Sequence, residues 1–440
     1  MKRFALAILL AAFAQATFAQ ATTAADTLIA RYDKAYRALD LHYLVLPYAD
    51  NVANLVRETD IPAQKTLFTG VAKELAGIDR SALNACQKLD LDRIAFDTGV
   101  NLQKLSLLEK VAALGDKAAV GDRGLYAAPL GRDWYRYFMK RWLTSDVTPE
   151  QLKADGELEL ERVLARYRGL QAAMGYAGKD EAFYAFLKSP RFLYPQGATP
   201  KADYERRQLT VFANLHKLFP PHSLAPAIVR ESTRGEAFPA DGYYESTSRT
   251  FYFNKNGPAY QKRNVDMLLL HESTPGHHFQ SHYAEQAKGA CPSTLAPAYN
   301  AAFSEGWGAY VEEFGAQLGV YRQPSDELGA FEWDLVRSIR VMLDVGINYE
   351  GWSDQQALAY WHRKLPMLPQ LAQREIARVR NWPVQAITYK YGSAVIRRLR
   401  EQERARLGEK FDIRVFHDTL LRNGAVPMAV LPTLFEDKPI

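Results

Sequence analysis

Cysteine is nearly absent from this chain of 440 residues, in which Cys86 and Cys291 are the only two. Two cysteines exclude the disulfide framework that holds many small secreted domains together. The two thiols could pair with each other in an oxidising compartment. Neither has a histidine close to it in sequence, which argues against a thiol nucleophile. The sequence leaves the pairing of these cysteines open and disfavours a cysteine enzyme.

A strong excess of one charge is also lacking. The chain has 55 Lys and Arg against 50 Asp and Glu, and its net charge of +5 includes Lys2 and Arg3 at the very start. Both signs are spread along the sequence, and no basic cluster is interleaved with aromatic residues. Binding to nucleic acid requires a concentrated positive surface. We therefore expect no nucleic-acid partner.

Long hydrophobic runs are missing beyond the first residues. The start combines Lys2 and Arg3 with an uncharged apolar stretch over residues 4–13 and small residues around Ala19 and Ala21. This pattern predicts a secretory signal peptide over residues 1–21, too short to remain as a membrane span. No cysteine lies near the cleavage site, which disfavours a lipid anchor. We expect an exported protein without an integral membrane segment after cleavage, periplasmic in a Gram-negative source.

The remaining chain is predicted to be mainly α-helical with one small β-element. Residues 227–233 and 242–254 are rich in aromatic and β-branched side chains, which favours short strands, with a hairpin as one arrangement. Thr148 and Pro149 have the form of a helix cap followed by a first turn. Elsewhere, apolar residues at three- and four-residue spacing predict helices. The main ones cover 27–39, 61–75, 91–114, 132–143, 149–174, 179–187, 202–218, 301–318, 328–346, 353–364, 372–379, 383–407 and 415–422.

A turn-rich break over residues 194–201 divides the mature chain into two regions. We expect an N-terminal helical region over residues 22–194 and a catalytic region over residues 195–440, joined in one continuous fold. The second region contains the motifs that carry chemistry. The small β-element directly precedes the first of them and could bind an extended peptide by strand addition, or could serve packing alone.

The first motif is Met267-Leu-Leu-Leu-His-Glu-Ser-Thr-Pro-Gly-His-His-Phe-Gln280. Its apolar run delivers His271 and Glu272 side by side, as in zinc peptidases in which a histidine binds the ion and the adjacent glutamate is the general base. In the usual motif the second histidine lies four residues after the first, but that position is Pro275 here. A zinc site thus requires the chain to leave regular helix geometry between Thr274 and His277.

The residues alone leave the second and third ligands open. On a straight helix, His277 is rotated by roughly 240° from His271, and His278 lies about 10 Å further along the axis. Pro275 removes a hydrogen-bond donor, so a break could bring either one to the metal. For the third ligand, Glu305 follows 34 residues after His271, shortly before Gly306 and Gly308, with Glu312 and Glu313 as runners-up. Alternatively, the histidines form a polar turn without a metal.

These residues resemble a bacterial family known as domain of unknown function 885. The shared pattern is His-Glu-x-x-Pro-Gly-His-His-x-Gln, and the resemblance extends from about Tyr243 to Leu431, with a weaker match in the N-terminal half. The further matching segments are Tyr243-Tyr244, Asn254, Glu305-Gly-Trp307, Leu335 to Gly346, Gly351-Trp-Ser353, Glu375-Ile-Ala-Arg378, Pro383 to Gly392 and Phe411 to Asp418. The family in turn is similar to helical zinc peptidases of the thimet oligopeptidase and carboxypeptidase Taq kinds, which share a metal helix and a downstream glutamate.

The resemblance implies roles for particular residues. It implies zinc held by His271, His277 and Glu305, with Glu272 as general base. Tyr389 is then a candidate donor to the oxyanion. The candidates for binding substrate, in part through bidentate contacts of arginine with a carboxylate, are Arg337, Arg340, Arg378, Gln385 and Tyr244.

Some of these residues also have a structural interpretation. The pairs Arg340–Asp344 and Glu375–Arg378 could simply brace helices, and His417 beside Asp418 could be a packed core histidine. The chain departs from the family at Asn348, where the family often has a histidine. If that histidine contacts the substrate or the transition state, its replacement alters the rate or the specificity of this protein.

Two functions of different classes remain in view. The first is an exported zinc-dependent hydrolase acting on peptides or another small amide or ester. The second is a periplasmic peptide-binding or scaffold protein that keeps a peptidase-like fold without turnover. Asn348 and the weaker N-terminal match favour the second, whereas an intact Glu272 favours the first.

Overall fold

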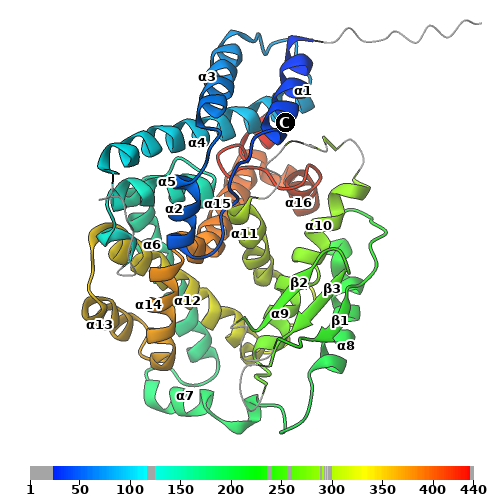
Figure 1. Cartoon of the computed structure of the whole chain (residues 1–440). Coiled ribbons are helices and arrows are strands. Elements are labelled where there is room, and N and C mark those ends of the chain that lie inside the picture. Colours follow the sequence, from blue (N-terminus) through cyan, green and yellow to red (C-terminus); the bar gives the residue numbers. More distant parts are fainter. Residues whose placement is uncertain are drawn as a thin grey trace, which may run out of the picture.

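The computed structural model describes residues 23–115, 124–234, 240–255, 260–287, 290–291, 293, 295 and 300–436 (Figure 1). The signal peptide predicted over residues 1–21 lies outside them. The described chain is mainly helical with one three-stranded sheet, as expected. No helix in these ranges is long and apolar enough to cross a membrane.

The N-terminal region is a succession of helices that follows the predicted spans closely. The helix cap expected at Thr148 is present, because its hydroxyl accepts from the backbone N–H of Gln151 at 3.2 Å and Pro149 occupies the first turn. The sequence pattern missed α2, whose nine residues are too few to show a clear periodicity. The helices are α1 (Ala24–Arg37), α2 (Tyr48–Val56), α3 (Ile61–Gly77), α4 (Ala85–Leu114), α5 (Gly131–Leu143), α6 (Pro149–Ala173) and α7 (Asp180–Leu187).

The sheet lies between α8 (Lys201–Asn214) and the helix that carries His271. Strands β2 (Gly242–Glu245) and β3 (Thr250–Phe253) form the expected hairpin, and β1 (Ile228–Glu231) adds to the other side of β3 in parallel. Phe251 and Phe253 point from β3 into the core, where both rings pack against Tyr204 of α8. Figure 1 shows the sheet at one side of the molecule, beside α9.

The remaining helices belong to the C-terminal half. Most end near their expected positions, but α15 starts five residues later than predicted, because Val384 at φ 66° breaks the helical path before it. The helices are α9 (Asn264–Glu272), α10 (His277–Gln286), α11 (Ala301–Val311), α12 (Leu328–Val345), α13 (Asp354–Lys364), α14 (Ala372–Asn381), α15 (Thr388–Leu407), α16 (Ile413–Leu421) and α17 (Thr433–Glu436).

The largest cluster of buried apolar side chains draws on both regions of the sequence. It includes Tyr48 of α2, Trp134 of α5 and Phe435 of α17, all at most 6% exposed. Helices α11 and α15 cross inside this cluster, where Gly306 meets Gly392. A second cluster joins α6 and α7 to α12, α13 and α14. The site-bearing helices are thus fixed in a core shared with the N-terminal region.

A disulfide joins the two cysteines, Cys86 at the start of α4 and Cys291 after α10. The sequence had left this pairing open. The bond links positions 205 residues apart, and closing so long a loop restricts the unfolded chain. It therefore ties the N-terminal helices to the half of the chain that carries the histidine motif.

Candidate metal centre

The helix that carries His271 stops where the motif required it to stop. Helix α9 ends at Glu272, α10 begins at His277, and the peptide bond between Thr274 and Pro275 is cis. A side chain at Gly276 would place a Cβ atom 1.8 Å from the carbonyl oxygen of His271, so only glycine permits this close return. The predicted break is confirmed, and it turns His277 back toward His271.

The break is held in place by neighbouring helices. The indole N–H of Trp307, in α11, donates to the carbonyl oxygen of Pro275 at 2.8 Å. The hydroxyl of Ser273 donates to the side chain of Gln208 on α8. Trp307 is fully buried, so its hydrogen bond is shielded from water. The Glu-Gly-Trp segment therefore positions the turn as well as supplying Glu305.

His271, His277 and Glu305 offer three ligand atoms that lie within 4.8 Å of one another. The Nε2 atom of His271 is 3.5 Å from Oε2 of Glu305, and the Nε2 atom of His277 is 3.4 Å from the same oxygen. Ligands of a tetrahedral zinc ion at 2.0–2.2 Å stand roughly 3.3–3.6 Å apart. The two measured separations match this spacing, and the N,N,O donor set is one that zinc accepts.

A second layer of hydrogen bonds orients His271. Its Nδ1–H donates to Oε1 of Glu312 at 2.8 Å, and both carboxylate oxygens of Glu312 accept from Nη1 of Arg337 at 2.8 Å. This bond fixes the tautomer and leaves Nε2 of His271 as the nitrogen that faces Glu305. Glu312 thus lies behind the imidazole of His271, outside the group formed by His271, His277 and Glu305. Its position two helical turns after Glu305 is the sequence signal for this placement.

The ionisable side chains of this cluster shift one another's pKa values. Burial alone lowers the pKa of His271, but hydrogen bonds to Glu305 and Glu312 outweigh it and raise that pKa to about 9. Burial raises the pKa of Glu305, but the two histidines hold it well below its ordinary value. Burial also raises the pKa of Glu272, against the opposing effect of His271 and His277.

Tyr389, which belongs to α15, lies against the imidazole of His271. Its ring is stacked near that of His271, with centroids 6.0 Å apart and an interplanar angle of 24°. The guanidinium of Arg337 lies 5.5 Å from the Tyr389 ring centroid and that of Arg378 lies 6.0 Å from it. Burial, followed by the charge of Glu305, raises the pKa of Tyr389 to about 12, so its hydroxyl keeps its proton at neutral pH.

The other predicted residues occupy distinct surroundings. Arg340 donates from Nε to Oε2 of Glu375 at 2.6 Å, so the expected structural pair of Arg340 with Asp344 is wrong. Asp344 instead accepts from the hydroxyl of Tyr135 on α5 and the backbone N–H of Val384, so its carboxylate is engaged by other elements although it lies one turn after Arg340. The side-chain oxygen of Gln385 is buried without a hydrogen-bond partner.

A second pair of histidines, His278 and His282, lies apart from His271 and bonds Tyr244. The hydroxyl of Tyr244 bonds Nδ1 of His278 at 2.9 Å and Nε2 of His282 at 3.0 Å, while Nε2 of His278 bonds the carbonyl oxygen of Ala225. Both ring nitrogens of His278 are therefore engaged. The structure thus places Tyr244 with His278 and His282, and it brings His277 rather than His278 to His271.

Asn348 is fully buried in the π-helical turn Gly346–Glu350. Its side-chain amide donates to the carbonyl oxygen of Val379 at 3.1 Å, and its Oδ1 atom has no hydrogen-bond partner. His417 is also buried, between the hydroxyl of Tyr310 and the carbonyl oxygen of Leu218, which fits the structural interpretation.

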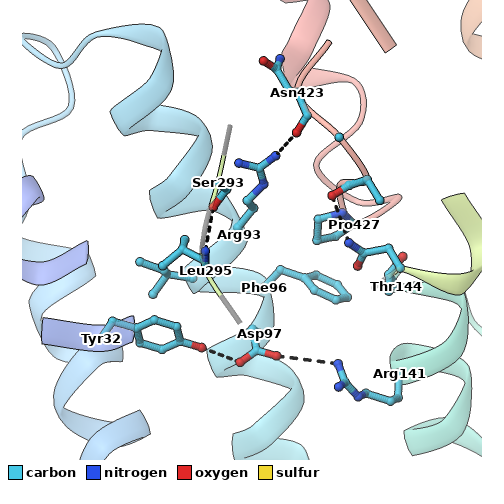
Figure 2. A pocket seen from close by; sticks show the side chains of 14 residues that line it. Tyr32, Arg93, Phe96, Asp97, Arg141, Thr144, Ser293, Leu295, Asn423 and Pro427 are labelled. Carbon is cyan, nitrogen blue, oxygen red and sulfur yellow. Dashed lines mark hydrogen bonds and ion pairs between the residues drawn. The ribbon is translucent and has the colours of Figure 1, made fainter. Parts of the chain in front are cut away.

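A cavity of about 190 Å³ lies at a different place, between α4, α5 and the segment around Asn423. Figure 2 shows Asp97 at its wall between Tyr32 and Arg141. The hydroxyl of Tyr32 donates to Asp97 at 2.5 Å, and Nη1 of Arg141 is 3.8 Å from the same carboxylate. None of the residues predicted for chemistry lines this cavity.

Comparison with known proteins identifies a family, and the similar solved structures include the two described next. The family described as bacterial protein of unknown function (DUF885) matches residues 9–434, so the match extends well beyond the stretch from about Tyr243 to Leu431 that carries the motifs. A "putative lipoprotein" of Colwellia psychrerythraea is 26% identical with a TM-score of 0.63, over 85% of this chain and 68% of that one. A "putative lipoprotein of unknown function" of Shewanella oneidensis is 17% identical with a TM-score of 0.59, over 94% and 88% respectively. No curated protein matches the chain.

Proposed function

The chain belongs to the DUF885 family of bacterial proteins of unknown function, and we propose that it is an exported zinc-dependent metallohydrolase that cleaves peptide bonds. One observation carries the proposal. Two imidazoles each lie at a zinc-ligand separation from the same carboxylate oxygen of Glu305, all three ligand atoms lie within 4.8 Å of one another, and the buried Glu272 is adjacent to His271 in the chain. Zinc bound there would lower the pKa of a coordinated water to about 7 and polarise a carbonyl group.

The chain's own residues have separate tasks in this proposal. Glu272 takes the proton of the attacking water and passes it to the leaving amine. Tyr389, protonated at neutral pH, donates a hydrogen bond to the oxygen on which negative charge develops. Glu312 and Arg337 keep His271 in the correct tautomer and orientation. His277 and Glu305 are 17% exposed in their side chains, which leaves the cluster open to an entering ligand.

Export is part of the same proposal. Lys2, Arg3 and the apolar residues 4–13 have the form of a secretory signal. Two structurally similar proteins are described as putative lipoproteins, which suits an envelope location. The disulfide between Cys86 and Cys291 also suits an oxidising compartment such as the periplasm.

Replacing Glu272 with glutamine tests the proposal directly. The purified wild type should contain about one zinc per chain and cleave members of a mixed peptide library. The E272Q variant should keep the metal and lose turnover by several orders of magnitude, because only the general base is removed. Absence of a stoichiometric transition metal in the wild type, or full activity of E272Q, would refute the proposal.

A second candidate function is a peptide-binding or scaffold protein without turnover. Asn348 favours it, because a buried amide with an unpaired oxygen stands where the family often has a histidine. The match of residues 9–434 to the family removes the other argument for it, a reduced N-terminal half. Saturable peptide binding by zinc-loaded wild type, with no product by mass spectrometry, would favour this candidate.

A further inference from the structure

Three arginines of α12 and α14 lie around one buried carboxylate, that of Glu375. Arg340 of α12 donates from Nε to Oε2 of Glu375 at 2.6 Å, and Arg374 donates from Nη2 to Oε1 at 3.0 Å. Arg378, one turn after Arg374 on α14, lies over the rings of Trp382 and Tyr389. Within the described chain no carboxylate within ion-pair distance of Arg378 is present.

The hydrogen-bonding capacity of these arginines is not used up. Arg340 is 1% exposed, yet its Nη2 atom has no hydrogen-bond partner. The Nε atom of Arg378 is likewise buried without a partner. A buried guanidinium with an unused N–H group is costly unless another molecule completes its hydrogen bonds. Burial and the charge of Arg378 lower the pKa of Arg340 to about 10, a further sign that positive charge here exceeds negative charge.

Arg337 supplies the contrast. It lies one turn before Arg340 on α12, but both oxygens of Glu312 accept from its Nη1 atom. Its charge is therefore balanced within the chain, and its task is to orient Glu312 and His271. Arg340 and Arg378 have only the carboxylate of Glu375 between them, and Arg374 competes for it from outside. The unbalanced pair is poised for an added anion.

Tyr389 connects this pair to the metal cluster. Its ring centroid is 6.0 Å from that of His271 and 6.0 Å from the guanidinium carbon of Arg378. The arginine and the histidine therefore lie no further apart than these two spans combined. An extended peptide covers about 3.3 Å per residue, so an anion at Arg378 is within roughly four residues of a carbonyl group at the cluster.

We propose that Arg340 and Arg378 bind the free carboxylate at the C-terminal end of a peptide substrate. Guanidinium groups pair with carboxylates through directed, charge-assisted hydrogen bonds, which the unused N–H groups supply. This assignment rests on the proposed peptidase function and deepens it, because it makes the protein a carboxypeptidase-type enzyme that removes up to roughly four residues from a chain end. The side-chain oxygen of Gln385 is also buried without a hydrogen-bond partner.

The test measures binding, so it does not depend on turnover. Zinc-loaded E272Q is mixed with a library of N-acetylated hexapeptides, offered once as free acids and once as C-terminal amides. Bound peptides are separated by ultrafiltration and identified by mass spectrometry, and the affinities of the best binders are then measured by calorimetry. We expect the free acids to bind at least about tenfold more tightly than the amides, the loss typical of an unpaired buried charge.

Variants identify the arginine responsible. Arg378→Met in the E272Q background should remove the preference for the acid, and Arg378→Lys should restore part of it as a point charge without the paired geometry. Arg374→Met is the matched control, because its side chain is 49% exposed and lies on the same helix. It should keep the preference. Retention of the preference in both Arg378 variants would overturn the assignment.

The outcomes separate this inference from the proposed function. Selective binding of free acids with no cleavage by the wild type supports the carboxylate site and overturns the hydrolase. Cleavage of acids and amides at equal rates supports the hydrolase and overturns the carboxylate site. A preference confined to peptides that end in Asp or Glu, with their C-terminal amides bound equally well, assigns the arginines to a side-chain carboxylate and also overturns the proposal. Equal affinity of all acids and amides, or no retention of either, overturns it as well.

Discussion

Gly308 lies where helix α11 presses against the imidazole of His271, so an alanine at this position displaces the proposed ligand. An added Cβ atom would lie 2.7 Å from Cε1 of His271 and 3.0 Å from its Nε2 atom, whereas ordinary contact begins at 3.4 Å. The ring must therefore retreat by about 0.7 Å. Ligand distances in zinc sites hold to within roughly 0.2 Å. We predict that Gly308→Ala lowers zinc affinity about 10–100-fold, or about 1.4–2.7 kcal/mol.

The assay is competition for zinc with a fluorescent chelator at fixed pH, with thermal unfolding of the metal-free protein alongside. Gly169→Ala is the matched control, because that glycine is exposed on α6 and an added Cβ meets nothing within 4 Å. The control should leave zinc affinity unchanged and stabilise the fold by up to about 1 kcal/mol through helix propensity. A folded Gly308→Ala protein that binds zinc as tightly as the wild type refutes the placement of His271 at the metal.

Three further substitutions test separate parts of the account. Glu312→Gln should weaken zinc binding about 10–100-fold, because it loosens the hydrogen bond that orients His271, and unchanged affinity in the chelator assay would contradict this. Tyr389→Phe should lower kcat about 10²–10³-fold with little change in KM, and a raised KM with unchanged kcat would instead assign the hydroxyl to ground-state binding. Burial raises the pKa of Glu375, but Arg340 and its neighbours lower it from 4.5 to about 2, so this carboxylate stabilises the fold above pH 4.5 and the stabilisation is lost as pH falls toward 2. Urea unfolding should show the stability of the wild type relative to Glu375→Gln shrinking by about 3 kcal/mol over that range, and a constant difference would contradict it.

The helical framework was predictable because its signals are local. Apolar spacing fixed the positions of α3, α5 and α6 within a few residues, and the cap at Thr148 was visible as a residue type. The break between α9 and α10 could also be predicted, since Pro275 cannot continue the hydrogen bonding of α9. The short helix α2 was not predicted, and neither was the parallel pairing of β1 with β3, although strand β1 itself was, because both features depend on tertiary packing rather than on local periodicity.

The residues of the candidate centre could be predicted from the sequence, but the hydrogen-bond and ion-pair partners around it could not. Adjacency singled out His271 and Glu272, while the choice of His277 came from resemblance and agrees with the geometry. The partner of Arg340 was misjudged, because the sequence offers an acidic residue one turn away on the same helix. The actual partner, Glu375, comes from another helix 35 residues later. Pairings of this kind follow from helix packing, which no local pattern reveals.

Diffraction at the zinc absorption edge from crystals of the zinc-loaded protein tests the central claim most directly. The account predicts one strong anomalous peak about 2.0–2.2 Å from Nε2 of His271, Nε2 of His277 and a carboxylate oxygen of Glu305. A peak at His278 and His282 instead would contradict it. So would the absence of any peak from crystals soaked in excess zinc.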